Sequence, residues 1–389
     1  MDILALSTEL KDWLENKALP LWRERGFDAA GGGFVETIDM AGQATRANRR
    51  SRVQPRQVYC FAEAGRRGWG GDWKTVAEAG LAYFDRVYLQ PDGFYGALAD
   101  ADGTLIDGSF DLYNQAFALL SFAYMAQVFP ERRDEMITRS NGLRQRLEAS
   151  YKHPVAGFEE DHPPRLPLGS NPHMHLFEAC LASEVAEGFD QVAWTNLADE
   201  IAVLAMDSFI DRETGALREF FDHDWQPFTG EKGRIVEPGH QFEWAWLLLR
   251  WSERRGDAEA IVKARRLFNV GEQYGISEAR DVAVMTLLDD FSVVDPVARL
   301  WPQTEWLKAA IRFATLTEGE EQARYLRSAA RAAHALKRFL DVPVAGLWRD
   351  KQREDGTFVD EPAPASSFYH ILCAIYELED CLEAIGSRQ

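Results

Sequence analysis

The alternation of long and short connections between helices constrains the fold of this chain more than any other feature of the sequence. Helical periodicity predicts twelve helices, and the connections between them alternate in length along the whole chain. The repeating unit is a pair of helices that recurs six times, at a spacing of roughly 55–70 residues. We expect the helices at 4–24, 53–68, 73–88, 111–128, 131–150, 172–187, 190–211, 237–255, 257–274, 296–315, 319–339 and 366–385.

Repeated helix pairs either stack as an open solenoid or close into a ring. The odd-numbered helices are amphipathic, as in EEQARYLRSAARAAHALKRF at 320–339, and carry a charged outer face. The even-numbered helices are apolar nearly all round, as in QAFALLSFAYMAQVF at 115–129. The fold predicted is therefore all-α, an (α/α)6 barrel that forms a single domain over 1–389. Its even helices are expected inside and its odd helices outside.

The long connections always lead from an odd helix to an even one. Several of them combine alternating aromatic residues with Asp-Gly, a pattern typical of small β-hairpins. In a closed ring, all six inner helices begin at the same end, and the long loops gather there. We therefore expect the functional site at the first turns of the even helices.

Polar and aromatic side chains do cluster at those first turns. His240 and Glu243 lie one helical turn apart, so the carboxylate is expected to touch and orient the imidazole. A histidine oriented in this way is a candidate general acid or base. The full set of candidates at the starts of the even helices is Arg56, Tyr113, Asn171, His175, His240, Glu243, Trp301, Glu305 and His370.

Each candidate also has a simpler interpretation. The histidines could be satisfied core residues, Arg56 a structural ion-pair partner, and Trp301 a packing residue. His240 and Glu243 could bind a metal, since di-iron bundles use this spacing, but a second such pair is missing and we expect no metal. His173 and His175 face different directions, so one of them is expected to be structural. Together, the candidates favour a site for a neutral polyhydroxylated ligand.

Charge and cysteine content exclude several other functions. A net charge of −19 argues against binding to nucleic acid or to an anionic membrane surface. No apolar run approaches the ~18 residues of a membrane span, and the N-terminus resembles an amphipathic helix rather than a signal peptide. The four cysteines are scattered without CxxC spacing, which is typical of free thiols in the cytoplasm. A homodimer remains open.

Five segments together resemble the N-acylglucosamine 2-epimerase superfamily, which includes sugar 2-epimerases and aldose–ketose isomerases. The segments are PRQVY at 55–59, NPHMHLFEA at 171–179, PGHQFEWAWLL at 238–248, LWPQTEWLKA at 300–309, and the late His370. The resemblance implies an (α/α)6 barrel that works without a metal or redox cofactor. It also implies that His240 and His370 form the acid–base pair. The remaining candidates match positions that line the sugar pocket in relatives.

Such an enzyme opens the sugar ring and removes the C2 proton to give a cis-enediol. A neutral imidazole suits the proton removal, and Arg56 can stabilise the negative charge that develops on O1 or O2. We expect His370 to carry the C2 proton and His240, oriented by Glu243, to open the ring or to act on the opposite face of the sugar. The product is a ketose if the proton returns to C1, or the 2-epimer if it returns to the opposite face of C2.

The substrate is expected to be a monosaccharide, with mannose–fructose isomerisation as the main hypothesis and 2-epimerisation or mannose 6-phosphate isomerisation as the alternatives. Four arginines on the long loops could hold a 6-phosphate, although we interpret them as a solvated charge run: Arg49, Arg50, Arg52 and Arg165. Two other classes stay open. One is a glycoside hydrolase that uses two of Glu178, Glu243 and Glu305. The other is a non-catalytic sugar-binding protein.

Overall fold

The computed structural model describes residues 3–387, and within them it contains the twelve predicted helices. The first runs unbroken over 3–26 as α1 (Ile3–Trp13) and α2 (Leu19–Leu21), each followed by a π-helical turn. The ends of the others lie within about one helical turn of the predictions, except that α8 ends at Leu204 and a π-helical turn, Ala205–Phe209, continues it toward the predicted end at 211. These are α3 (Val53–Arg66), α4 (Trp73–Tyr88), α5 (Leu112–Val128), α6 (Arg133–Ser150), α7 (Ser170–Ser183), α8 (Gln191–Leu204), α9 (Pro238–Arg255), α10 (Ala258–Tyr274), α11 (Leu300–Thr315), α12 (Gly319–Leu340) and α13 (Ser366–Gly386).

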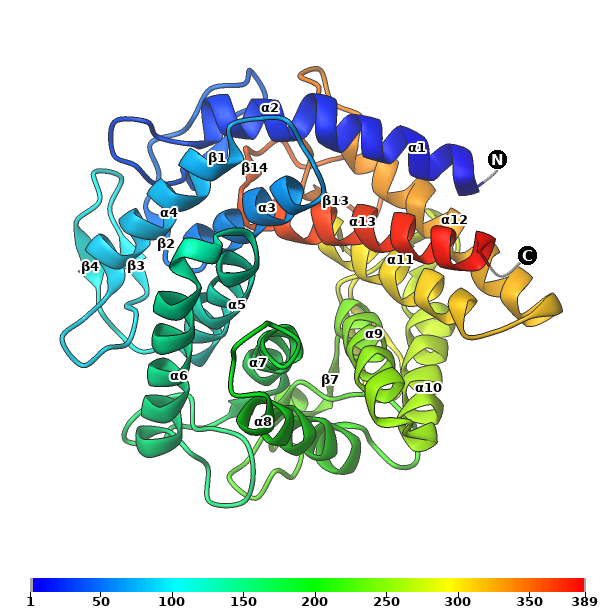
Figure 1. Ribbon diagram of the computed structural model, residues 1–389. Helices are drawn as coiled ribbons and strands as arrows, with labels where there is room; N and C mark the ends of the chain where they lie inside the picture. Colours follow the sequence, from blue (N-terminus) through cyan, green and yellow to red (C-terminus); the bar gives the residue numbers. More distant parts are fainter. Residues whose placement is uncertain (1–2, 388–389) are drawn as a thin grey trace.

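The helices form two concentric rings (Figure 1). The inner ring consists of α3, α5, α7, α9, α11 and α13, and α13 packs against α3 to close it. The inner helices are buried on nearly every side, whereas the outer helix α12 buries only one face. The predicted (α/α)6 barrel is therefore confirmed, and the open solenoid is excluded. When α1 and α2 are counted as one helix, the second helix of each pair lies inside, as expected.

The long loops form a belt of short strands around one end of the barrel. Antiparallel pairing within one long loop, as the predicted hairpins require, occurs at β3–β4, β8–β9 and β10–β11 and as isolated bridges in other loops, such as Phe27–Phe34, Ile210–Leu217 and Gln352–Phe358. The other pairs, β1–β14, β2–β3, β5–β6, β7–β10 and β12–β13, join one long loop to the next. The strands are β1 (Thr37–Ile38), β2 (Arg49–Arg50), β3 (Leu98–Ala99), β4 (Leu105–Asp107), β5 (Leu168–Gly169), β6 (Phe220–Phe221), β7 (Ile235–Val236), β8 (Ile276–Ser277), β9 (Val282–Ala283), β10 (Thr286–Leu288), β11 (Val293–Asp295), β12 (Ala298–Arg299), β13 (Lys351–Gln352) and β14 (Ala363–Pro364).

A buried glutamine near the start of an inner helix holds the long loop before that helix. Its amide oxygen accepts a hydrogen bond from one loop N–H, and its amide nitrogen donates to the carbonyl of the same loop residue. Because the side chain mimics a peptide, it satisfies loop backbone groups that would otherwise be buried without partners. The pairs are Gln54 with Phe34, Gln115 with Tyr95, Gln241 with Leu217, and Gln303 with Ala283.

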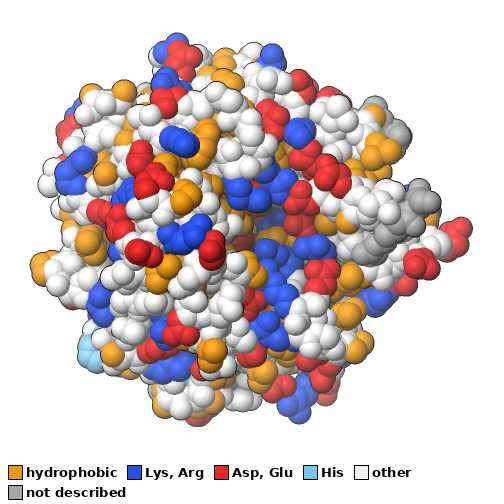
Figure 2. Space-filling model, in the orientation of Figure 1, with side chains coloured by type: hydrophobic (Ala, Val, Ile, Leu, Met, Phe, Trp, Pro, Cys, Tyr) orange, Lys and Arg blue, Asp and Glu red, His pale blue; other side chains and the backbone are white. Residues whose placement is uncertain are grey.

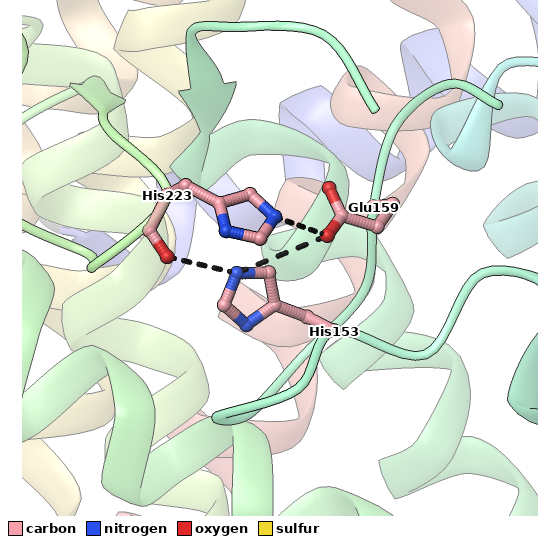
Figure 3. Close-up of side chains that lie close together, drawn as sticks. All are labelled: His153, Glu159 and His223. Carbon is pink, nitrogen blue, oxygen red and sulfur yellow. Dashed lines mark hydrogen bonds and ion pairs between the residues drawn. The ribbon is translucent and has the colours of Figure 1, made fainter. Parts of the chain in front are cut away.

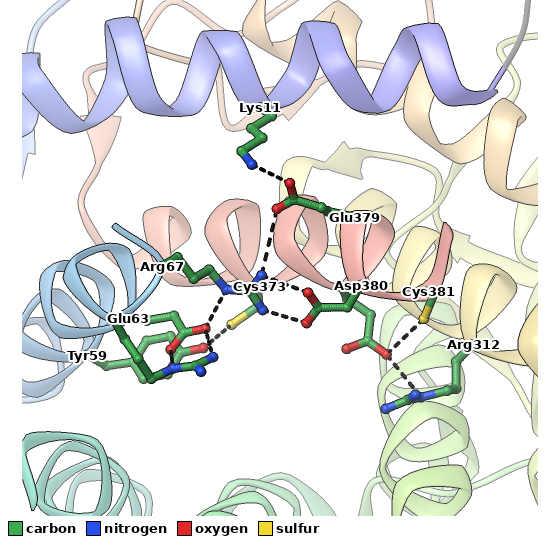
Figure 4. Close-up of polar contacts among 11 residues, drawn as sticks. Lys11, Tyr59, Glu63, Arg67, Arg312, Cys373, Glu379, Asp380 and Cys381 are labelled. Atoms are coloured by element: carbon green, nitrogen blue, oxygen red, sulfur yellow. Dashed lines mark hydrogen bonds and ion pairs between the residues drawn. The ribbon is translucent and has the colours of Figure 1, made fainter. Parts of the chain in front are cut away.

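The opposite end of the barrel, where the inner helices end, is held by ion pairs between the rings. Arg67 at the end of α3 bridges Glu63 and Asp380, and Lys11 of α1 contacts Glu379 of α13 (Figure 4). On this face, basic and acidic side chains gather around a central hollow (Figure 2). At this end of the barrel, ion pairs therefore take the place of the strand pairs that join the loops at the other end.

Two further sequence-based expectations concern the membrane and the cysteines. Among residues 3–387, every helix is too short or too polar to cross a membrane. All four cysteines are buried free thiols.

Candidate active site

A cavity of about 260 Å³ opens at the end of the barrel where the inner helices begin, inside the belt of strands. It contains every predicted site residue except Glu305, which lies directly behind His370 and accepts its hydrogen bond. The lining residues are Arg50, Arg52, Arg56, Tyr113, Asn171, His175, Glu237, His240, Glu243, Met285, Arg299, Trp301, Ser366, Ser367 and His370. The structure therefore brings the predicted residues together in one cavity at the starts of the inner helices.

The same two helical positions supply site residues in every repeat. One of these positions lies two residues before the loop-holding glutamine, and the other lies two residues after it. The two positions are four residues apart, so their side chains share one helix face. In α7, His173 replaces the glutamine: its Nε2 accepts from the N–H of Phe158, and its Nδ1 bonds the carbonyl of Gly169. His173 is therefore the structural histidine of the pair. The resulting positions are Arg52 and Arg56, Tyr113 and Phe117, Asn171 and His175, Gly239 and Glu243, Trp301 and Glu305, and Ser366 and His370.

His370 has the environment of a neutral base. Its Nδ1 lies 2.8 Å from Glu305 Oε1, so Nδ1–H donates to the carboxylate and the Nε2 lone pair remains for the substrate. Burial lowers the pKa of His370 well below its ordinary value, and the nearby charges of Arg56 and Lys308 lower it further. His370 can therefore accept a proton from carbon at neutral pH.

His240 is held in the opposite protonation state. Its Nδ1 lies 2.9 Å from Glu219 Oε2 and 3.4 Å from Glu237 Oε2. Burial alone would lower the pKa of His240, but these two carboxylates outweigh it and raise the pKa to about 10. Around neutral pH, His240 is therefore an imidazolium that can donate a proton.

The predicted orientation of His240 by Glu243 is wrong. Glu219 performs that role, and a hydrogen bond of 2.9 Å from the Ser170 hydroxyl fixes its carboxylate. Glu243 points instead toward the barrel axis, where its Oε1 lies 4.0 Å from His175 Nδ1. Sequence spacing missed Glu219 because it belongs to a different segment, just before β6.

Trp301 links the two catalytic candidates. Its ring centroid lies 5.0 Å from that of His240 and 5.8 Å from that of His370. Gly239 permits this packing, because a Cβ at that position would lie 2.4 Å from the indole. A neutral imidazole and an imidazolium thus contact one aromatic wall of the cavity.

A buried charge network lies beneath the cavity floor. Lys308 is fully buried, with Nζ 2.6 Å from Glu305 Oε2 and 3.8 Å from the centroid of Trp246. Glu178 accepts a hydrogen bond from the Tyr369 hydroxyl. Burial opposes its ionisation, but His175 and Lys308 lower the pKa of Glu178 to about 2. Glu178 is therefore an anion, and both Glu178 and Glu305 have committed partners.

Glu243 differs from these two carboxylates. Burial raises its pKa well above the ordinary value, and the nearby charge of Glu305 adds to the effect. Among the described residues, neither of its oxygens makes a hydrogen bond. Glu243 is therefore a protonated carboxyl group that can donate to a substrate oxygen.

Arginines surround the upper part of the cavity. Arg56 is 3% exposed and donates to the Ser366 carbonyl at 3.2 Å and to the Tyr113 hydroxyl. Arg50 and Arg52 also line the cavity, which corrects our interpretation of them as part of a solvated charge run. The other two members lie elsewhere: Arg49 pairs with Asp28, and the exposed Arg165 pairs with Asp161.

Among the described residues, three groups of side chains are close enough to share a metal ion: His175, Glu178 and Glu243 and also Glu243, Glu305 and His370 at the cavity, and His153, Glu159 and His223 outside it (Figure 3). His153 Nδ1 accepts hydrogen bonds from the N–H of Val155 and from Trp225 Nε1, at 3.1 and 3.2 Å. Its Nε2 therefore carries the proton and donates to the His223 carbonyl at 3.1 Å. Because both ring nitrogens are occupied, this cluster joins two long loops and is not a metal site.

The environment of His240 leads to a prediction about pH dependence. Replacing Glu219 with glutamine removes the carboxylate that favours the imidazolium, so the pKa of His240 should fall. Activity that needs protonated His240 is lost as pH rises through this pKa, so the basic limb of the kcat/KM profile should move to lower pH. Glu243→Gln is the matched control and should move this limb much less, because Glu243 contributes less than Glu219 to raising the pKa of His240. A basic limb that moved with Glu243→Gln but not with Glu219→Gln would contradict the assignment.

Comparison with known proteins places the chain among sugar-converting enzymes. A family model described as N-acylglucosamine 2-epimerase matches residues 32–374. A protein of Rhizobium meliloti (strain 1021) named "Mannose-6-phosphate isomerase" is 77% identical over 383 residues, covering 98% of this chain and 99% of that protein. A protein of Marinomonas mediterranea named "D-mannose isomerase" is 24% identical over 370 residues, covering 89% and 91%.

Solved structures share the fold. The crystal structure of a D-mannose isomerase superposes with a TM-score of 0.87 at 21% identity, covering 96% of this chain and 97% of that one. A cellobiose 2-epimerase from Bacillus thermoamylovorans B4167 superposes with a TM-score of 0.85 at 16% identity, covering 97% and 99%. The resemblance inferred from the sequence motifs is confirmed.

Proposed function

We propose that this chain, which belongs to the N-acylglucosamine 2-epimerase family, interconverts mannose 6-phosphate and fructose 6-phosphate. Family membership confirms the predicted enzyme class, a sugar isomerase or epimerase. The specific substrate is supported by the printed name of the relative that is 77% identical. We place the reaction in the cytoplasm, because buried free thiols are typical of a reducing compartment.

The observation that carries the proposal is the pair of imidazoles in opposite protonation states around one indole. The imidazolium of His240 protonates the ring oxygen O5 as the C1–O5 bond breaks, and the O1 hydroxyl proton passes to solvent. The neutral Nε2 of His370 then removes the proton from C2, and O1 takes up a proton to give the cis-enediol. The protonated His370, which exchanges its proton with solvent, delivers a proton to C1 while O2 loses its proton, which produces the ketose.

Charge develops on the sugar oxygens during proton removal. Arg56 supplies a buried cation there, and the protonated Glu243 supplies a neutral hydrogen-bond donor. Donors fixed before the reaction stabilise such charge strongly in a site that excludes water. For 2-epimerisation, His240 would also have to return a proton to C2 from the opposite face of the sugar. The 2-epimer is therefore the second product to be measured.

The carboxyl groups argue against the glycoside hydrolase alternative. Known hydrolases share this fold, such as a GH76 α-mannanase with a TM-score of 0.67 at 8% identity, but such a likeness concerns the fold alone. A glycosidase needs two carboxyl groups flanking the scissile bond. Of the three candidates, Glu178 is held by Tyr369 and Glu305 by His370 and Lys308. Only Glu243 keeps free oxygens.

A panel of sugars tests this proposal. The enzyme, exhaustively treated with a chelator, should convert mannose 6-phosphate to fructose 6-phosphate, because the proposed proton transfers need only side chains. Mannose, glucose 6-phosphate, N-acetylglucosamine and cellobiose serve as competing substrates, with NMR to separate ketose from 2-epimer. Release of nitrophenol from 4-nitrophenyl mannoside would support the hydrolase instead. Activity that disappeared on chelation and returned with one divalent ion would contradict the metal-free mechanism.

A further inference from the structure

We infer that Arg50, Arg52 and Arg299 form an anion subsite for the C6 phosphate of the sugar. The inference rests on the proposed function, because it assigns one part of the substrate to one side of the same cavity. Arg50 and Arg52 stand just before α3 and Arg299 just before α11, and α13 lies between these two helices in the inner ring. His240 lies on α9, beyond α11 in the ring.

The charge of the molecule makes this cluster unusual. The chain has 62 acidic and only 43 basic residues, yet four arginines line a cavity of about 260 Å³. A neutral sugar needs one cation at the developing oxyanion, and Arg56 already supplies it. The other three arginines are explained if the ligand itself carries negative charge.

Two of these arginines are fixed on opposite sides of the first turn of α13. Arg50 pairs with Glu36 and donates to the Ser366 hydroxyl at 3.2 Å. Arg299 binds Asp350 through Nε and Nη2, at 2.9 and 2.8 Å. Their orientation is therefore set before any ligand arrives, which lowers the entropic cost of binding.

The second serine of that turn completes the arrangement. Ser367 donates from its hydroxyl to Asp350 at 3.0 Å, so Arg299 is tied to α13 through one carboxylate. No side chain caps this 21-residue helix at its first turn. The positive end of its dipole therefore faces the space between the two fixed arginines.

Arg52 is the arginine of the three whose guanidinium makes no close ion pair. Its nearest carboxylate is Asp111, with Nη2 and Oδ2 4.0 Å apart, too far for a hydrogen bond. Burial raises the pKa of Asp111, which weakens it further as a counter-ion. The guanidinium instead lies 4.7 Å from the centroid of the Tyr113 ring. A phosphate that reaches this group gains a charge-assisted, bidentate contact without breaking an ion pair.

The spacing along α13 suits a six-carbon sugar phosphate. Ser366 and His370 lie four residues apart on one helix face, which corresponds to a rise of about 6 Å. A sugar with C2 at His370 can therefore place its C6 phosphate beside Ser366 and the arginines. The same position should accept inorganic phosphate as a competitor of the phosphorylated substrate.

Arg52→Met tests the subsite through the ratio of two kcat/KM values, for mannose 6-phosphate and for mannose. We expect the ratio to fall ~10–100-fold, as for the loss of a hydrogen bond to a charged group. The inhibition constant of inorganic phosphate should rise in parallel, and Arg52→Lys should restore part of both. Arg165→Met is the matched control, because Arg165 is exposed outside the cavity and its removal should leave the ratio unchanged.

The outcomes separate this inference from the proposed function. An equal fall for both sugars, with unchanged phosphate inhibition, would overturn the subsite and leave the isomerase intact. So would a wild-type enzyme that isomerises mannose but is not inhibited by phosphate, a result that does not depend on any variant folding. Failure of the wild type to isomerise either sugar would instead overturn the proposed function.

Discussion

Replacing His370 with asparagine is expected to lower kcat/KM for mannose 6-phosphate isomerisation by about 10²–10⁴-fold, the usual cost of removing a general base. Asparagine can still donate a hydrogen bond to Glu305, so the floor of the cavity should remain intact. His175, another histidine of the cavity, contacts Glu178 and Glu243 through its Nδ1. Initial rates of fructose 6-phosphate formation measure the loss.

The variant should also lose exchange of the C2 proton with solvent D2O, even when an open-chain analogue is supplied. His334→Asn is the control, since His334 is exposed on the outer helix α12 and its loss should change neither quantity. Full exchange in His370→Asn, with none in His240→Asn, would show that the roles of the two histidines are reversed.

Replacing His240 with asparagine should lower kcat/KM for the cyclic sugar by a similar factor, about 10²–10⁴-fold. The reason differs, because this variant lacks the imidazolium that protonates O5 and ring opening becomes limiting. His370, Glu305 and Lys308 remain, so the machinery for proton removal survives. An open-chain analogue without O5 should therefore lose much less activity than mannose 6-phosphate.

The comparison of cyclic and open-chain substrates decides the role of His240. Equal losses on the two substrates would mean that His240 acts in the enediol step itself and not in ring opening. Full activity of both His240→Asn and His370→Asn would refute the acid–base mechanism altogether.

The architecture could be predicted because it depends on a property that the sequence displays directly. Alternating loop lengths fix which helices are neighbours, and apolar periodicity separates inner helices such as α5 from outer helices such as α12. Once the ring closes, the starts of the inner helices converge. His240, His370 and Trp301 were therefore found without any knowledge of their contacts.

The partner of His240 could not be predicted from local spacing. His240 and Glu243 are helical neighbours, but Gln241 fixes the rotation of α9 by binding the backbone of Leu217. That rotation directs Glu243 to the barrel axis and His240 to the belt of strands. There it meets Glu219, which the pairing of β5 with β6 brings beside it.

The arginines illustrate the same limit. Arg49 and Arg50 are adjacent in β2, and adjacent strand residues point to opposite sides. Arg49 contacts Asp28 away from the cavity, whereas Arg50 lines it. The sequence pattern does not indicate which side is the interior, because that depends on pairing with β3 from the next long loop.

NMR of mannose 6-phosphate in D2O with the wild-type enzyme tests the central claim, a cis-enediol formed by proton transfer through a histidine. The account predicts fructose 6-phosphate that carries solvent deuterium at C1, together with slow loss of the C2 proton from the remaining mannose 6-phosphate. Fructose 6-phosphate that received the C2 hydrogen at C1 without any solvent deuterium would contradict the account, because that is a hydride shift and not proton transfer.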